Sequence, residues 1–336
     1  MNYKEERAAS KGGKQNYIDG IERLIAKKQK EAEVIRDEYA KDIMTDTERY
    51  RRDLRDLLGW PLTETRDATL PEVKMEKLAE EDGHEIFRTE VEILDGLTMS
   101  GLFFKAKTEA RRPLVIVQHG GLGTPELIAG LYGTTGNYND MLERVARHGV
   151  HVFAPQLLLW ADEYEVAHDR LVIDARLKHL GGSKTALEIC GIMRILDYFE
   201  IQPYVSTLGM VGMSYGGFYT LFTSAIDTRI KSALSCAYFN SRDNYTFSDW
   251  TWQGAANKFD DAEVAALTYP RKLYLRVAES DPLFDPSFAR RSFETIKRRC
   301  AEVGTDWVDF AVFEGEHEFV KDDNVIKQLI TDLSLT

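Results

Sequence analysis

A short tract in the second half of the chain places the tightest constraint on the fold. It reads LGMVGMSYGGFYTLFTSA, in which an apolar run over 208–213 leads to a serine flanked by glycines and then to an apolar helical pattern. This order predicts a strand, a sharp turn and a helix, with Ser214 at the apex of the turn. Main chains can pass this closely only where side chains are small, and Gly212, Gly216 and Gly217 meet that need.

The pattern Gly-x-Ser-x-Gly in this setting is typical of a nucleophile elbow. The turn lifts the Ser214 hydroxyl above the end of the sheet, at the N-terminus of a helix whose dipole favours a developing negative charge. The same pattern also occurs in ordinary glycine-rich turns, and here the strand before it and the helix after it favour catalysis. We therefore predict that Ser214 is a nucleophile.

A base must accompany this serine, because a hydroxyl is a weak nucleophile until its proton is removed. Behind an elbow of this kind, the acid and the histidine follow the serine along the chain. Of seven histidines only His317 lies after Ser214, and it comes just past the last predicted strand. We predict His317 as the base, in preference to a surface histidine on an acidic loop.

The acid is expected after the preceding strand, where the sequence AESDPLFDP offers two aspartates. Asp281 is the first beyond the strand, and Pro282 would fix the turn that aims it. Asp285 precedes a proline and a helical stretch, so a helix N-cap explains it equally well. We predict that Asp281 orients the imidazole and stabilises its cation.

Acyl transfer also requires hydrogen-bond donors for the oxyanion of the tetrahedral intermediate. One predicted donor is the backbone N–H of Tyr215, directly after the nucleophile. The second is expected in the loop HGGLG after the strand over 113–120, with Gly121 as the first choice and Leu122 as the next. His119 in this loop is predicted to brace it rather than to take part in the chemistry.

Around the elbow, short apolar strands alternate with longer helical patterns. Asp95-Gly96 joins the first two strands as a hairpin. An antiparallel start followed by this alternation predicts an α/β fold, with a mostly parallel eight-stranded sheet and helices on both faces. The predicted strands cover residues 85–96, 97–107, 113–120, 150–156, 208–213, 230–239, 271–280 and 307–315. The predicted helices after the hairpin cover 137–148, 183–200, 216–226, 287–302 and 322–333.

The first 60 residues differ from the rest of the chain in charge. They hold 14 basic and 13 acidic residues, whereas the remainder holds 29 and 42. The polar, glycine-bearing composition of residues 1–16 predicts a frayed end. A helical pattern with an apolar stripe follows, and this pattern ends at Gly59 and Pro61. We predict an N-terminal helical arm over residues 1–60 and a catalytic domain over 61–336. Either the arm packs against the domain, or it joins two copies as a homodimer.

Composition disfavours several classes of partner and cofactor. The formal net charge of −12 argues against nucleic acid, because phosphate backbones are bound by clustered Lys and Arg. No run approaches the roughly 20 apolar residues of a membrane helix, and the polar first residues are not a secretory signal. Three widely spaced cysteines suit a reducing compartment, so we expect a cytoplasmic protein. No metal-binding or phosphate-loop motif is present, so no metal and no cofactor are expected.

Three tryptophans are candidates for a substrate pocket. Trp160 follows the strand over 150–156, while Trp250 and Trp252 lie in the long loop after the strand that holds Cys236. All three are expected at the elbow end of the sheet, where they could line a site for the acyl or alcohol group. They could equally pack beneath a long loop.

Several segments together resemble one family. HGGLGTPE, PQLLLW, GMSYGGFYTLFTSA, AESDPLFDP and FEGEHEF are similar to the dienelactone-hydrolase-like and acetyl-xylan-esterase-like branch of the α/β-hydrolase superfamily, over about residues 70–336. The resemblance implies the α/β-hydrolase fold and cleavage of a small acyl or acetyl ester, without metal or organic cofactor. Dienelactone hydrolases use a cysteine nucleophile, whereas this chain has Ser214.

Two other functions remain open. Prolyl-oligopeptidase-type serine peptidases share the HGG loop and the elbow, but they carry a β-propeller, and the chain has no propeller repeat. The other alternative is a non-catalytic protein of the same fold that binds a partner through its arm and pocket. A Ser, Asp and His set in the expected order favours the esterase.

Overall fold

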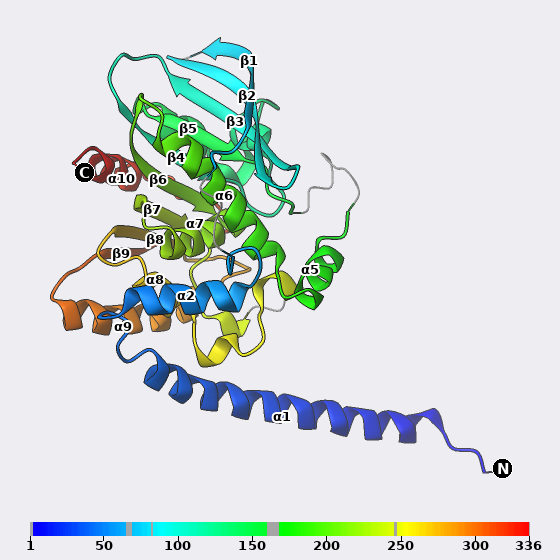
Figure 1. The fold of residues 1–336 in the computed structure, drawn as a ribbon. Coiled ribbons are helices and arrows are strands. Elements are labelled where there is room, and N and C mark those ends of the chain that lie inside the picture. Colours follow the sequence, from blue (N-terminus) through cyan, green and yellow to red (C-terminus); the bar gives the residue numbers. More distant parts are fainter. Residues whose placement is uncertain (1–2, 65–68, 82, 160–167, 245–246, 336) are drawn as a thin grey trace.

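The computed structural model describes residues 3–64, 69–81, 83–159, 168–244 and 247–335. Across these residues it has one nine-stranded sheet in the order β1-β2-β3-β5-β4-β6-β7-β8-β9 (Figure 1). Along this order the pairs β1–β2, β2–β3 and β3–β5 are antiparallel. Every pair from β5 to β9 is parallel. The strands are β1 (Val73–Glu81), β2 (His84–Leu94), β3 (Leu97–Ala106), β4 (Arg112–Gln118), β5 (His151–Pro155), β6 (Val205–Met213), β7 (Ile230–Cys236), β8 (Lys272–Ala278) and β9 (Val308–Phe313).

The predicted count of eight strands is wrong by one, and the additional strand is β1. It pairs with β2 from Val73 opposite Val91 to Glu81 opposite His84. Its side chains are half-buried or exposed, so it lacks the strongly apolar alternation that identifies the other strands in the sequence. The other eight strands lie within three residues of the predicted ends.

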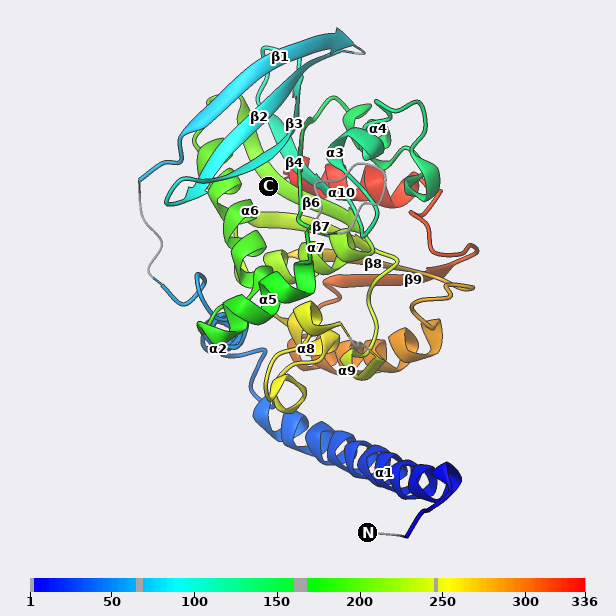
Figure 2. The same cartoon turned by 90° about the vertical axis from the view of Figure 1, so that its right-hand side faces the viewer.

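Helices cover both faces of the sheet (Figures 1 and 2). α6, α7 and α9 contact one face, and α3, α4 and α10 contact the other. α3, α5 and α8 lie where the sequence predicts no helix. The helices are α1 (Arg7–Tyr39), α2 (Thr47–Leu58), α3 (Pro125–Ile128), α4 (Met141–Ala146), α5 (Arg170–His179), α6 (Lys184–Glu200), α7 (Tyr215–Ile226), α8 (Asp261–Ala266), α9 (Pro286–Val303) and α10 (Asn324–Leu335).

The central strands carry the core on both sides. From β4 to β7 nearly every side chain is buried, as expected for parallel strands with helices on both faces. One apolar cluster lies between the sheet and the side that holds α2, α6 and α7. The second lies between the sheet and α4 and α10. The ends of β6 and of the strands beside it are thereby held in fixed positions.

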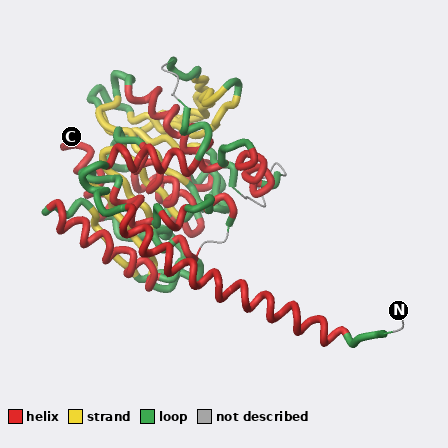
Figure 3. Tube along the Cα trace, turned by 60° about the horizontal axis from the view of Figure 1, so that its bottom comes forward, coloured by secondary structure: helices red, strands yellow, loops and turns green. Residues whose placement is uncertain are grey.

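The two N-terminal helices are placed differently. α1 begins at Arg7, inside the segment predicted to fray, and its first part projects from the body of the molecule (Figure 3). α2 belongs to the core, where Tyr50, Leu54 and Leu58 are fully buried. The division into an arm over 1–60 and a domain over 61–336 stays a prediction. No helix in the described ranges is long and apolar enough to cross a membrane.

Candidate active site

Ser214 is the single residue between the end of β6 and the start of α7. Its φ of 58° and ψ of −123° lie where side chains other than glycine are strained. The Ser214 N–H donates to the carbonyl of Cys236 at 2.9 Å, and the Phe218 N–H donates to the Ser214 carbonyl at 2.9 Å. The predicted strand, turn and helix are therefore present, and the strained backbone is held by hydrogen bonds on both sides.

The glycines around the turn are required by close contacts between main chains. A Cβ on Gly212 would lie 2.1 Å from the carbonyl oxygen of Gly216, and a Cβ on Gly216 would lie 2.1 Å from that of Gln118. A Cβ on Gly217 would lie 2.8 Å from the carbonyl oxygen of Cys236. Because these neighbours are backbone atoms, they cannot move aside as a flexible side chain would.

The structure brings Ser214, His317 and Asp281 together in one chain of hydrogen bonds. His317 Nε2 lies 2.9 Å from Ser214 Oγ, and His317 Nδ1 lies 2.8 Å from Asp281 Oδ2. An imidazole with its proton on Nδ1 satisfies both contacts, because it donates to the carboxylate and accepts from the hydroxyl. This is the arrangement in which a histidine can take the proton of a serine.

The two aspartates after β8 have different partners. The Asp281 carboxylate is buried, and its Oδ1 accepts the N–H groups of Leu283 at 2.8 Å and Phe284 at 3.1 Å. These bonds fix the carboxylate so that Oδ2 faces His317. Asp285 is exposed and caps α9, where its Oδ1 accepts the N–H of Ser287 at 2.8 Å. Backbone and side-chain hydrogen bonds from Ser287 lower the pKa of Asp285.

The loop that carries His317 is tied down by two asparagines that the sequence analysis did not single out. The Asn137 amide donates to the His317 carbonyl at 2.8 Å. The Asn139 amide donates to the Glu318 carboxylate at 2.8 Å and to the Phe319 carbonyl at 2.7 Å. These contacts span about 180 positions, and no local pattern marks them.

The HGG loop after β4 lies beside the nucleophile. A Cβ on Gly120 would lie 3.0 Å from the Ser214 Cβ, and the Gly120 N–H donates to the Tyr138 hydroxyl at 2.9 Å. Gly121 and Leu122 follow directly, with the Leu122 side chain exposed. Tyr215, whose N–H is the other predicted oxyanion donor, is the first residue of α7. Gly120 thus brings the start of the HGG loop beside Ser214, and Tyr215 follows the serine along the chain. The oxyanion donors themselves stay a prediction.

His119 is buried and braces the HGG loop. Its Nδ1 lies 2.9 Å from the Gly120 carbonyl, and its Nε2 accepts the Leu157 N–H at 3.1 Å. Burial lowers the pKa of His119 to about 4. A neutral ring with its proton on Nδ1 makes both bonds, so His119 links the loop after β4 to the segment after β5.

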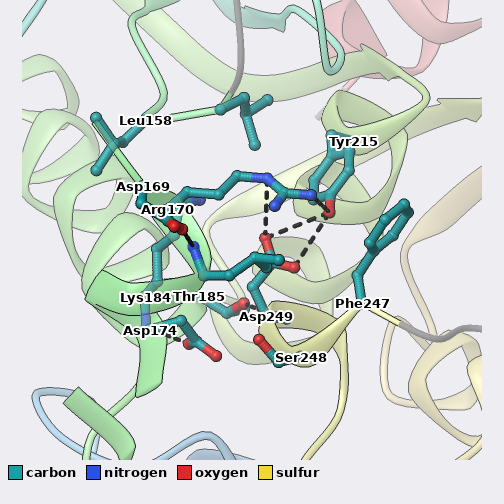
Figure 4. Close-up of polar contacts among 12 residues, drawn as sticks. Leu158, Asp169, Arg170, Asp174, Lys184, Thr185, Tyr215, Phe247, Ser248 and Asp249 are labelled. Atoms are coloured by element: carbon teal, nitrogen blue, oxygen red, sulfur yellow. Dashed lines mark hydrogen bonds and ion pairs between the residues drawn. The ribbon is translucent and has the colours of Figure 1, made fainter. Parts of the chain in front are cut away.

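A buried polar cluster lies behind Tyr215 (Figure 4). The Tyr215 hydroxyl donates to the Asp249 carboxylate at 3.2 Å, and Arg170 donates to the same hydroxyl at 3.3 Å. Arg170 Nε also lies 3.7 Å from Asp249 Oδ2. Burial, followed by the Asp249 charge, raises the pKa of Tyr215. The cluster joins α5 and the segment after β7 to the residue that follows the nucleophile, and the sequence analysis did not identify it.

The three candidate tryptophans have separate outcomes. Trp160 lies outside the described residues. Trp250 is buried and packs against Tyr215, with 4.0 Å between ring centroids. Trp252 is half-buried and stacks on Phe218 with 6.4 Å between centroids. The structure therefore places Trp250 and Trp252 in the aromatic packing against α7.

A mostly apolar cavity of about 450 Å³ adjoins the end of the HGG loop. Gly123 and Thr124 of that loop line it, and Glu188 forms part of its wall. The Glu188 carboxylate is engaged, because it accepts the Leu158 N–H at 2.7 Å and Lys184 Nζ at 2.7 Å. The apolar lining includes Ile93, Leu97, Met99, Leu157, Leu159 and Leu187. Among the described residues, no group of three His, Cys, Asp or Glu side chains could hold a metal ion.

Comparison with known proteins supports the fold. No protein-family model matches the sequence, and no curated protein shows significant similarity to it. Solved structures do resemble the chain. The glucuronoyl esterase from Solibacter usitatus is 16% identical and has a TM-score of 0.65, over 88% of this chain and 93% of that one.

Two further structures agree with the first. Acetyl xylan esterase 1 from a Thermoanaerobacterium species is 16% identical, with a TM-score of 0.56 over 86% of this chain and 94% of that one. A promiscuous esterase from a marine bacterial metagenome is 16% identical, with a TM-score of 0.64 over 88% and 92%. At these identities the likeness establishes a shared fold. The chain therefore has the α/β-hydrolase fold that its sequence predicts, in the form found in these esterases.

Proposed function

We propose that the protein is a serine hydrolase that cleaves a carboxylic ester of a small acyl or acetyl group through an acyl-enzyme. The observation that carries the proposal is the continuous hydrogen-bond chain from Ser214 through His317 to Asp281. The similar structures are named as esterases, which supports an ester as the substrate.

In the proposed reaction, the Ser214 oxygen attacks the ester carbonyl carbon while His317 Nε2 takes the hydroxyl proton. Asp281 stabilises the imidazolium that forms. The tetrahedral intermediate collapses by breaking the bond to the alcohol oxygen, which leaves with the proton from His317. A water molecule, deprotonated by the same histidine, then releases the acid and restores Ser214. These steps require no metal and no organic cofactor.

The oxyanion of the intermediate needs donors that are in place before the reaction. We propose the backbone N–H of Tyr215 and that of Gly121, with Leu122 as the alternative to Gly121. The proximity of Gly120 to Ser214 supports this assignment, as does the bracing of the loop by His119 and Tyr138. Tyr215 is held in place by Asp249 through its hydroxyl.

The cavity beside the HGG loop suggests where an apolar part of the substrate would bind. Its lining by Gly123 and Thr124 places it next to the loop that supplies the proposed oxyanion donor. Seven of its fourteen lining residues are leucine, isoleucine or methionine, and the Glu188 carboxylate already has partners. Apolar walls stabilise hydrocarbon groups far better than sugar hydroxyls.

A covalent probe tests the chemistry directly. Ser214→Ala should abolish labelling by a fluorophosphonate and lower kcat on p-nitrophenyl acetate by roughly 10⁴–10⁶. Ser224→Ala, in α7 and away from the site, is the matched control and should label as the wild type does. Near-normal activity in the Ser214→Ala protein would exclude Ser214 as the nucleophile. A wild-type protein that neither labels nor hydrolyses esters would favour the non-catalytic alternative.

The role of the cavity is tested by filling it from α6. Leu187→Trp should lower kcat/KM for hexyl or hexanoyl esters by about tenfold while acetate esters of short alcohols change little. Running both an acyl series and an alcohol series tells which half of the ester enters the cavity. Leu180→Trp, at an exposed position before α6, is the control. Equal losses on short and long esters in both series would exclude this cavity as a substrate site.

A further inference from the structure

The first two-thirds of α1 makes almost no contact with the rest of the chain. Residues 7–28 are exposed except for the half-buried Gly20, and the helix leaves the body as a rod in Figures 1 and 3. At 1.5 Å per residue this segment is about 33 Å long. It therefore presents a long surface that the chain does not cover by itself.

This surface carries an apolar stripe. Five apolar side chains lie within about 60° of one line along the helix, at the 3.6-residue period. They are 39% to 73% exposed: Tyr17, Ile18, Ile21, Leu24 and Ile25. We call these five residues the α1 stripe. Isolated exposed apolar residues are ordinary, but an aligned row of this length is typical of an interface.

The α1 stripe continues the face by which the helix docks on its own body. Farther along the same line, Ala32 is buried and Tyr39 packs edge-to-face on Tyr50 and Phe259. Arg36 fastens this end to the body, since it donates to the Ala256 carbonyl at 2.7 Å. The helix face that packs on the body at the C-terminal end of α1 thus continues, uncovered, along its N-terminal part.

The composition of the free segment indicates that it needs a partner to stay helical. It contains Gly12, Gly13 and Gly20, and each glycine costs about 1 kcal/mol relative to alanine in a helix. Intrinsic propensity contributes little to helix stability in proteins, so three glycines leave this segment weakly helical by itself. Packing of the apolar stripe is the usual source of the missing stability.

We propose that the α1 stripe is the interface between two copies of this chain, whose helices pair antiparallel about a two-fold axis. The distribution of charge along α1 favours a second copy of the chain as the partner. Residues 7–30 hold seven basic and two acidic residues, whereas residues 31–39 hold one basic and four acidic. Antiparallel pairing places the basic end of each helix beside the acidic end of the other, and a parallel pair would oppose like charges.

An anionic membrane is the other surface that a basic amphipathic helix can bind. The rest of the molecule disfavours it, because the chain after residue 60 holds 42 acidic against 29 basic residues. That excess of negative charge is repelled by an anionic lipid surface. The same charge attracts the basic tip of a second copy, which antiparallel pairing brings close to the partner's body. This proposal is independent of the esterase proposal.

Light scattering on the full-length protein tests the interface. The wild type should be a dimer at micromolar concentration, and Ile21→Asp/Ile25→Asp should be a monomer because two charges enter the centre of the stripe. Val34→Asp is the matched control: it lies on the same helix, is 71% exposed and faces away from the stripe, so it should remain dimeric. All three proteins should unfold at similar temperatures, because the body is untouched.

Two results would overturn the proposal. One is a wild type that stays monomeric at the highest soluble concentration, and the other is a stripe variant that still dimerises as the wild type does. Co-sedimentation with phosphatidylserine vesicles, lost in the stripe variant while the wild type alone is monomeric, would assign the stripe to a membrane instead.

The direction of pairing is tested by a short bismaleimide cross-linker. End-to-end antiparallel pairing brings the middle of α1 to the two-fold axis, so Leu24→Cys should cross-link to its counterpart in the second copy. Lys11→Cys, near the tip, should not, since the two tips lie far apart. Efficient cross-linking at both positions would show a parallel pair and contradict the antiparallel arrangement.

Discussion

At the scale of single residues, the two aspartates after β8 have different roles although they are only four positions apart. Asp281 is buried and holds His317, whereas Asp285 is exposed and caps α9. A carboxylate beside an imidazole sets its tautomer, while a cap needs only an acceptor.

This difference predicts opposite results for one substitution. Asp281→Asn should lower kcat by roughly 10²–10⁴, because an amide favours the wrong tautomer of His317. Asp285→Asn should leave kcat nearly unchanged, since asparagine caps helices as well as aspartate does. Steady-state kinetics on both variants, with thermal unfolding to confirm folding, checks the ranking. The reverse ranking would move the acid to Asp285.

A second prediction at this scale concerns His119 and acid stability. Its pKa falls from about 6.5 in the unfolded chain to about 4 in the folded protein, because burial disfavours the charged ring. The unfolded state therefore binds the proton more tightly. The stability that the neutral ring contributes is fully present above pH 6.5 and is lost as pH falls toward 4.

Replacing His119 should flatten this pH dependence. In His119→Gln the amide oxygen can still accept the Leu157 N–H, but the side chain does not titrate. The free energy of unfolding should fall by about 2 kcal/mol less between pH 7 and pH 5 than in the wild type. Urea unfolding at the two pH values measures it. Equal losses in both proteins would show that another group dominates.

At the scale of elements, the elbow depends on how closely α7 approaches β4. The carbonyl of Gln118 lies 2.1 Å from where a Cβ on Gly216 would be. Gly216→Ala should therefore force the start of α7 away from the sheet, lower stability by at least about 2 kcal/mol and greatly slow fluorophosphonate labelling.

The matched control for this substitution is a helical glycine with open space around it. A Cβ on Gly13 of α1 meets no atom within 4 Å. Gly13→Ala should leave labelling unchanged, and it should raise α1 helicity because alanine is the better helix former. Thermal unfolding and circular dichroism compare the two variants. Normal labelling by the Gly216→Ala protein would contradict the close approach.

At the scale of the whole molecule, the two N-terminal helices should respond differently to truncation. α2 is part of the core, and Arg51 in it donates to the carbonyls of Ala225 at 3.1 Å and Leu267 at 2.8 Å. Deleting residues 1–60 exposes apolar core and should lower Tm by roughly 10 °C or more, or prevent soluble expression. Deleting residues 1–30 should leave Tm and labelling close to those of the full chain.

The comparison is made by differential scanning calorimetry on both truncated proteins. A stable protein without residues 1–60 would show that α2 packs weakly despite its burial. A strong loss from deleting residues 1–30 would show that the free part of α1 supports the body, either directly or through a second copy. Light scattering at the same concentrations separates those two causes.

Eight of the nine strands, the elbow and the chain order of Ser214, the aspartates and His317 can be read from the sequence. These features are local: a buried strand shows as an apolar run, and a tight turn requires small residues within a few positions. The one strand that was missed, β1, is largely exposed and so carries a weak signal. The buried strands carry a strong apolar signal, so the sequence predicts their ends well.

Which side chains meet is visible only in the folded chain. It separated Asp281 from Asp285 by the direction of a carboxylate, and it tied the His317 loop to Asn137 and Tyr215 to Asp249. It also placed Trp250 in the core and left the α1 stripe exposed. Such contacts join positions tens to hundreds of residues apart, so they depend on how whole elements pack. Periodicity within a segment reports only which of its faces is buried, and it does not identify the residue on the other side.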